Sequence, residues 1–298
     1  MQTPDSARRS LARIREWAME RIILLCGAMT ITIVVLIFAF LLRDGLPTFR
    51  HVTVPDFLLG RDWYPLSDKF QILPLILGSL LVTAGAILIA VPIGIASAVY
   101  LAEVAPLRVR EVLKPTVEVL AGIPSVVIGF IGMVVLGPYI KSIFDLPTGL
   151  TALTGSVMLA FMAMPTIISI SEDAIVAVPR DYGAGALALG ATPWQAISGV
   201  TVPAAKSGII AAVMLGIGRA IGETMTVLMV TGNAAVIPHS FLQPVRTMTA
   251  TIAAEMGEVA QGTPHYYSLF AIGIVLFGMT FLINLTADLA LQRSGRSS

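Results

Sequence analysis

The sequence has 298 residues, of which 56% are hydrophobic and only 12% charged, and its formal net charge is +1. A soluble domain carries about 25% charged residues, so this chain has too little polar surface to face water, and lipid is the expected solvent. The near-neutral charge excludes a strongly basic nucleic-acid binder. The single cysteine, Cys26, excludes an internal disulfide and a cysteine-based metal site.

Six apolar runs are long enough to cross a bilayer, which takes roughly 20 residues. The first run is longer than the apolar region of a signal peptide and no A-x-A-like site follows it, so we expect a retained signal anchor. The sequence therefore predicts an all-α, polytopic membrane protein with a transmembrane domain over residues 22–287. Its expected spans are 22–42, 74–101, 116–140, 150–171, 207–232 and 266–287.

Lysine and arginine are divided unequally between the two sets of connecting segments, and cytoplasmic loops are the ones enriched in them. One set contains Arg8, Arg9, Arg13, Arg15, Arg21, Arg108, Arg110, Lys114, Arg180, Lys206, Arg293 and Arg296. The other contains only Arg43, Arg50, Arg61, Lys69, Lys141 and Arg246. We therefore expect the N-terminal segment 1–21, the tail 288–298 and the loop 172–206 to be cytoplasmic. Around Thr249–Val259, a helix is expected to pack over the outer mouth.

The cytoplasmic segment 181–203 is typical of two short helices joined by a glycine elbow. Asp181 is expected to cap a helix over Tyr182–Leu189, and Gly190 to supply the left-handed residue at its end. Thr192 is expected to cap a second helix that has Pro193 in its first turn. This shape fits either a stub that docks into a groove of another protein or a helical hairpin that packs on its own bundle.

The spacing within this segment resembles the cytoplasmic loop of ABC importer permeases, which reads E-A-A, three residues, Gly, nine residues and I-x-L-P. Here Ala184, Gly185 and Ala186 are followed by Gly190 and by Val200-Thr201-Val202-Pro203 at the same spacing. The glutamate of the pattern is replaced by Ala184. The resemblance implies a type I ABC importer permease fold in which this loop couples to an ATPase subunit.

The fifth span contains the central charges of the transmembrane domain. Arg219 lies at its midpoint, and Glu223 follows one turn later, so the two are expected to share a helix face and to pair, with Thr226 nearby. A central arginine costs about 2.5–3.5 kcal/mol on insertion scales, so it should face protein or a wet cavity. We expect Arg219, Glu223 and Thr226 to line a translocation pathway; the competing interpretation is a salt bridge that only joins helices.

Four stretches resemble the phosphate-specific transporter permeases of the PstC type, and the likeness runs from about residue 56 to 287. They are FLLGRDWYP (57–65), IPSVVIGF (123–130), GRAIGETM (218–225) and TATIAAEMGE (249–258). The resemblance implies inward phosphate transport across the cytoplasmic membrane of a bacterium or archaeon. It also implies a PstA-type sister permease, two PstB-type ATPase subunits and an extracytoplasmic PstS-type phosphate-binding protein as partners.

No phosphate-binding loop for ATP is present, since no lysine follows a glycine. The chain is therefore expected to be a non-enzymatic subunit that binds no cofactor, with ATP and magnesium on the partner ATPase. Three alternatives stay open. One is a permease for another oxyanion, sulfate or molybdate. The second is an ion-coupled secondary transporter, although no duplicated halves with paired broken helices are apparent. The third is an intramembrane enzyme, which the missing catalytic sets disfavour.

Overall fold

The computed structural model describes residues 4–295, with side chains between residues 16 and 286 and at Leu289. Parts of the expected cytoplasmic ends, residues 1–3 and 296–298, lie outside the described residues. The described chain is mostly helical, which confirms the all-α fold class.

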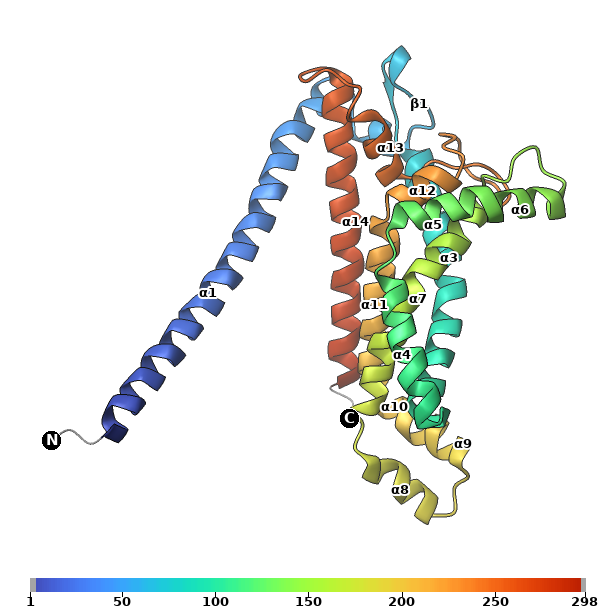
Figure 1. The fold of residues 1–298 in the computed structure, drawn as a ribbon. Helices are drawn as coiled ribbons and strands as arrows, with labels where there is room; N and C mark the ends of the chain where they lie inside the picture. Colours follow the sequence, from blue (N-terminus) through green and yellow to red (C-terminus); the bar gives the residue numbers. More distant parts are fainter. Residues whose placement is uncertain (1–3, 296–298) are drawn as a thin grey trace.

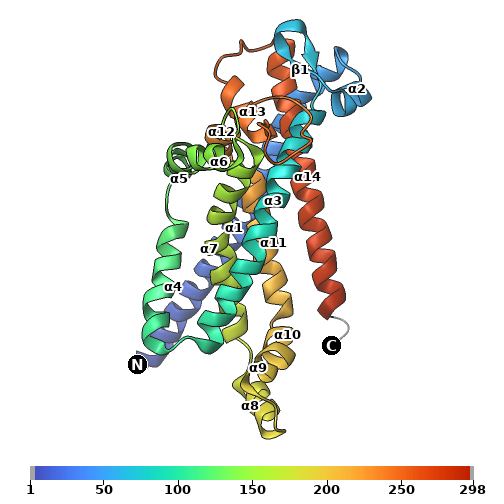
Figure 2. The same cartoon turned by 90° about the vertical axis from the view of Figure 1, so that its right-hand side faces the viewer.

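Three helices form the centre of the fold: α3 (Leu73–Val99), α7 (Ala152–Val176) and α11 (Lys206–Gly222). They run along the long axis of the molecule, and α7 packs against both of the others (Figure 2). Ile167 of α7 fits against two glycines. A Cβ added at Gly216 would lie 2.6 Å from Ile167 Cγ1, and one added at Gly94 would lie 2.8 Å from its Cγ2. Glycine at these positions lets the helices approach closely, as is usual between membrane helices.

Two long helices flank this centre, α1 (Pro4–Gly45) and α14 (Pro264–Gly295). They meet near the C-terminal end of α1, where Phe38 stacks on Phe277 with 4.9 Å between ring centroids and Phe40 meets Phe270 edge-on at 5.5 Å. From that contact α1 diverges from the rest of the molecule (Figure 1). Its apolar side chains are therefore largely exposed within this chain, and they are available to lipid or to another subunit.

The molecule has two distinct ends (Figure 1). The hairpin end holds α2 (Val54–Leu59), the antiparallel pair β1 (Trp63–Tyr64) and β2 (Lys69–Phe70), and α13 (Met248–Glu255). The loop end holds α8 (Arg180–Ala188), α9 (Pro193–Ala196) and α10 (Val202–Ala204), and the first residues of α1 and the last of α14 lie toward this end. Helix α13 confirms the helix expected around residues 249–259.

The third expected span, 116–140, is wrong as a single helix. The chain instead forms α4 (Leu107–Ala121), α5 (Ser125–Ile131) and α6 (Gly137–Phe144). Helix α4 runs along the bundle, whereas α5 and α6 lie across it (Figures 1 and 2). Pro124 explains the break, because a proline disfavours helical backbone at the residue before it.

The fifth expected span, 207–232, is also broken. Helix α11 ends at Gly222, and the chain resumes as α12 (Met225–Val230). At its other end, α11 is bent by 68° against the helical segment Pro193–Ala204. Within the described residues, five helices are long and apolar enough to cross a membrane, and the bent pair provides a sixth. By length and composition alone, the predicted number of spans is matched if the bent pair counts as one span and if Ser125–Phe144, which contains α5 and α6, counts as another.

Candidate functional site

The breaks in the third and fifth spans lie against each other. The Thr226 hydroxyl at the start of α12 donates to the Ser125 carbonyl at the start of α5, at 3.0 Å, and it lies 3.1 Å from Met162 Sδ. On the other side of the breaks, Arg219 Nη2 donates to the carbonyl of Ala121, the last residue of α4, at 3.4 Å. The two interrupted helices thus meet at their breaks, and we call this place the junction.

The ion pair expected between Arg219 and Glu223 is wrong. A pair four residues apart shares a face only if the helix continues, but the backbone of Glu223 is extended, with φ −70° and ψ 134°. Its Oε1 instead accepts from the Thr226 N–H at 3.2 Å, which satisfies one of the unpaired donors at the start of α12. Arg219 is exposed within this chain and Glu223 is half-buried. The guanidinium therefore faces out of this chain and does not pair with the Glu223 carboxylate.

Hydrogen bonds connect three of the four stretches on which the resemblance rests, and the residue that follows one of them bonds to the fourth. Ser125 of the stretch 123–130 accepts from Thr226, the residue after the stretch 218–225, and the Thr249 hydroxyl of the stretch 249–258 donates to the Glu223 carbonyl at 2.7 Å. In the same stretch, Glu255 accepts from Trp63 Nε1, which belongs to the stretch 57–65, at 3.2 Å. The sequence singled these stretches out separately, and the fold brings them together.

Glu255 was not expected to have a role, yet it gathers three side chains at the hairpin end. Besides Trp63, it accepts from Arg246 Nη1 at 2.5 Å and lies 2.8 Å from His265 Nε2. Arg246 Nε also donates to the Asn233 carbonyl at 3.1 Å. The carboxylate therefore ties α13 to the hairpin, to the start of α14 and to the segment that follows α12.

At the loop end, most of the expected capping is confirmed. Gly190 has φ +90°, and the Ala191 N–H donates across it to the Ala186 carbonyl at 3.1 Å, which closes α8 as a left-handed cap does. Thr192 and Gln195 form a reciprocal capping box at the start of α9. The cap expected at Asp181 is wrong, because α8 begins at Arg180 and Asp181 lies in its first turn with no side-chain cap bond.

The residues predicted to form a coupling loop lie on an exposed stub. Ala184, Gly185 and Ala186 are all on α8, and Pro203 is in the first turn of α10. The large apolar side chains point away from the bundle: Leu187 is 48% exposed, Leu189 92% and Trp194 66%. A hairpin that packed on its own bundle would bury these side chains, so the geometry favours docking into another protein.

Comparison with known proteins identifies the family to which this chain belongs. The family model for "Binding-protein-dependent transport system inner membrane component" matches residues 90–296, more than half of the chain. The chain belongs to this family. The permease is 42% identical over 265 residues to the probable ABC transporter permease protein YqgH of Bacillus subtilis, covering 88% of this chain and 86% of that protein. It is 39% identical over 257 residues to the phosphate transport system permease protein PstC of Mesorhizobium japonicum, covering 80% and 78%.

Solved structures agree on the fold. The permease superposes on a chain of a bacterial alginate ABC transporter with a TM-score of 0.65 at 16% identity, covering 94% of this chain and 95% of that one. A chain of the MetNI methionine ABC transporter gives 0.58 at 18% identity, covering 78% and 99%. At such low identity these likenesses concern the fold alone. They confirm the expected ABC importer permease fold, while the roles of individual side chains stay predictions.

The permease also contains a charge cluster that the sequence did not suggest. Glu172, near the end of α7, is 1% exposed; its Oε1 accepts from Arg110 Nη2 and its Oε2 from Lys114 Nζ, the latter at 2.5 Å. Lys114 Nζ also lies 2.8 Å from Asp173 Oδ1. We call these four residues the α4–α7 charge cluster. The sequence contained one sign of this cluster: Arg110 and Lys114 are four residues apart, which places both cations on one helix face.

Lys114 precedes the apolar segment Ser125–Phe144, and its charge is reinforced by both carboxylates. The hydrogen bond to Asp173, and next the one to Glu172, raise the pKa of Lys114 above its ordinary value. Lysine is already protonated at neutral pH, so this shift keeps Lys114 charged throughout the physiological range.

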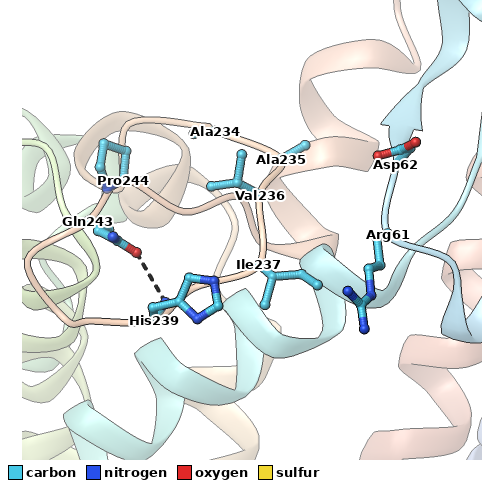
Figure 3. A pocket seen from close by; sticks show the side chains of 9 residues that line it. All are labelled: Arg61, Asp62, Ala234, Ala235, Val236, Ile237, His239, Gln243 and Pro244. Atoms are coloured by element: carbon cyan, nitrogen blue, oxygen red, sulfur yellow. Dashed lines mark hydrogen bonds between the residues drawn. The ribbon is translucent and has the colours of Figure 1, made fainter.

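A hollow of about 600 Å³ lies at the hairpin end (Figure 3). Arg61 and Asp62 lie on one side of it, and His239 and Gln243 on the other, where the His239 N–H donates to Gln243 Oε1 at 3.1 Å. Its lining carries both signs of charge and does not include Arg219.

Proposed function

We propose that this permease is the PstC-type subunit of an ATP-driven phosphate importer and that it moves inorganic phosphate inward across the cytoplasmic membrane of a bacterium or archaeon. The observation that carries the proposal is Arg219. It is a guanidinium at the junction of two interrupted helices, exposed on this chain and unpaired with Glu223. Sequence relatives that include phosphate transport permeases of several bacteria support the substrate.

The chemistry of Arg219 suits a passing oxyanion. A guanidinium has five N–H donors in a fork that matches phosphate oxygens, and here one nitrogen makes a single long bond to the Ala121 carbonyl. The remaining donors can meet an anion for a short time. Glu223 lies at the break with its carboxylate held by the Thr226 N–H, where its negative charge would keep the anion from binding too tightly to leave.

The partners follow from the two ends of the molecule. In this proposal the loop end is cytoplasmic, and α8 and α9 dock on one of two ATPase subunits that bind ATP and magnesium, so the permease itself is not an enzyme. The hairpin end faces the extracytoplasmic phosphate-binding protein, with the hollow beside Arg61 as a contact surface. The exposed face of Arg219 and the apolar length of α1 are completed by a sister permease and by lipid.

The runner-up substrate is another oxyanion, sulfate or molybdate, because an arginine fork does not discriminate strongly between tetrahedral anions. The discriminating experiment uses the permease with its sister permease, both ATPase subunits and the binding protein in proteoliposomes that contain MgATP. Uptake of radiolabelled phosphate is measured beside sulfate and molybdate. The proposal expects saturable phosphate uptake that a hundredfold excess of sulfate does not suppress. Uptake of sulfate or molybdate in preference to phosphate would overturn the substrate assignment.

A further inference from the structure

The α4–α7 charge cluster is a built feature that the proposed translocation chemistry does not use. Its centre, Glu172, is almost fully buried, whereas the side chains of Arg110 and Lys114 are each 31% exposed and that of Asp173 is 64% exposed. A carboxylate with so little exposure would be expensive without partners, and here each of its two oxygens accepts from a different cation. Both cations come from the same face of α4.

Helix α4 depends on these charges because it has little else to hold it. None of the residues from Leu107 to Ala121, all of which are described, is fully buried. The helix packs beside α7, but it contributes no side chain to the apolar core. The ion pairs at its N-terminal half therefore fix its position against α7 with more geometric precision than loose apolar contact would.

The two ends of α4 connect two functional parts of the permease. The cluster lies one turn before the end of α7, from which the chain leads through Pro179 into α8 and the coupling loop. From Arg110 to Ala121, α4 spans about 16 Å at 1.5 Å per residue. At its far end the Ala121 carbonyl accepts from Arg219. A displacement of α7 at the loop end can therefore reach the junction through α4.

We propose that Glu172 is a positioning residue that clamps α4 to α7, so that movement of the coupling loop is carried to the carbonyl that holds Arg219. The proposal rests on the proposed function. It differs from a purely stabilising role, because a buried ion pair is weak evidence for stability and is often replaceable by apolar residues. What the charges provide here is a fixed register between two helices that move together.

The test uses the complete transporter in proteoliposomes and compares Glu172→Gln with two controls. Glu172→Asp retains the charge, and Glu111→Gln removes a carboxylate from an exposed position of α4 outside the cluster. Phosphate uptake and ATP hydrolysis are measured together as phosphate moved per ATP. A second readout does not depend on substrate. Spin labels replace Glu118 on α4 and Val176 on α7 in a Cys26→Ser background, and their separation is measured without nucleotide and in the ATP-trapped state.

In the wild type and in Glu111→Gln, we expect one label separation that is retained in both states. In Glu172→Gln we expect the distribution to broaden and the phosphate moved per ATP to fall at least fivefold, with ATP hydrolysis retained and partial rescue in Glu172→Asp. An unchanged separation and a wild-type coupling ratio in Glu172→Gln would overturn the proposal. So would a loss of uptake that only follows a loss of assembled complex. Absence of phosphate uptake in the wild type would instead contradict the proposed function, and the label separation would still decide the role of Glu172.

Discussion

Replacement of Arg219 separates a transport role from a structural one. The structure predicts that Arg219→Gln barely changes stability, because the side chain is exposed on this chain and its one bond goes to a backbone carbonyl at 3.4 Å. No buried carboxylate is left without a partner, since Glu223 bonds to the Thr226 N–H. The change in the free energy of unfolding should stay within about 0.5 kcal/mol, as for other surface substitutions.

The effect on transport should be much larger. A hydrogen bond to a charged group contributes about 1.5–3 kcal/mol, and about 1.36 kcal/mol in a barrier corresponds to a factor of ten in rate. If Arg219 contacts the anion during passage, Arg219→Gln should therefore lower the uptake rate by roughly ten- to 150-fold. Arg219→Lys retains the charge but loses the fork, so it should retain more activity than the glutamine variant.

The assay is initial phosphate uptake by the complete transporter in proteoliposomes, normalised to assembled complex. Arg50→Gln is the matched control, since it removes an exposed arginine at the hairpin end, away from the junction. Wild-type uptake in both Arg219 variants would show that the guanidinium takes no part in transport. The same conclusion would follow if uptake fell only in proportion to lost assembly, because Arg219 would then serve structure alone.

Three further predictions concern other parts of the fold. The double substitution Arg110→Ala with Lys114→Ala leaves the buried Glu172 carboxylate without its cations and should destabilise the complex by about 3–5 kcal/mol. Glu172→Gln should cost less, because the two cations remain partly solvated. Thermal unfolding in detergent compares the two variants, and equal losses of stability would contradict this prediction. Gly149→Ala puts a Cβ 1.8 Å from the Gly137 carbonyl oxygen and should reduce the folded yield, whereas Gly278→Ala, with nothing within 4 Å, should not. Size-exclusion profiles of both variants measure the folded yield, and a normal profile for Gly149→Ala would contradict the prediction. Thr192→Ala removes the capping box of α9 at a cost of about 1 kcal/mol, so hydrogen exchange should accelerate over residues 193–196. Unchanged exchange there would show that the cap does not stabilise α9.

The sequence was informative where local chemistry decides the structure. Gly190, Thr192 and Pro193 fix the elbow of the coupling loop through backbone conformation and capping, and both outcomes were predictable from residue type. The apolar runs predicted the membrane helices because hydropathy reflects the solvent around them. The spacing from Ala184 to Gly190 and Pro203 matches the coupling pattern, although the glutamate of that pattern is replaced.

The sequence was less informative where distant segments meet. Hydropathy does not detect a break at Glu223, because the residues on both sides are equally apolar, and the expected pairing with Arg219 failed for that reason. Pro124 was visible inside an expected span, but its effect could have been a kink or a complete break. Glu172 and Lys114 are 58 residues apart, and no periodicity connects them; only the fold shows that both belong to one cluster.

The broken helices at residues 122–124 and 223–224 also resemble a feature of secondary transporters, so the source of energy is the claim most worth testing. The direct measurement is phosphate accumulation by vesicles that hold this permease alone, compared with vesicles that hold the complete transporter. We expect accumulation only in the complete transporter and only with hydrolysable ATP. Accumulation by the permease alone, driven by a proton or sodium gradient, would contradict this expectation.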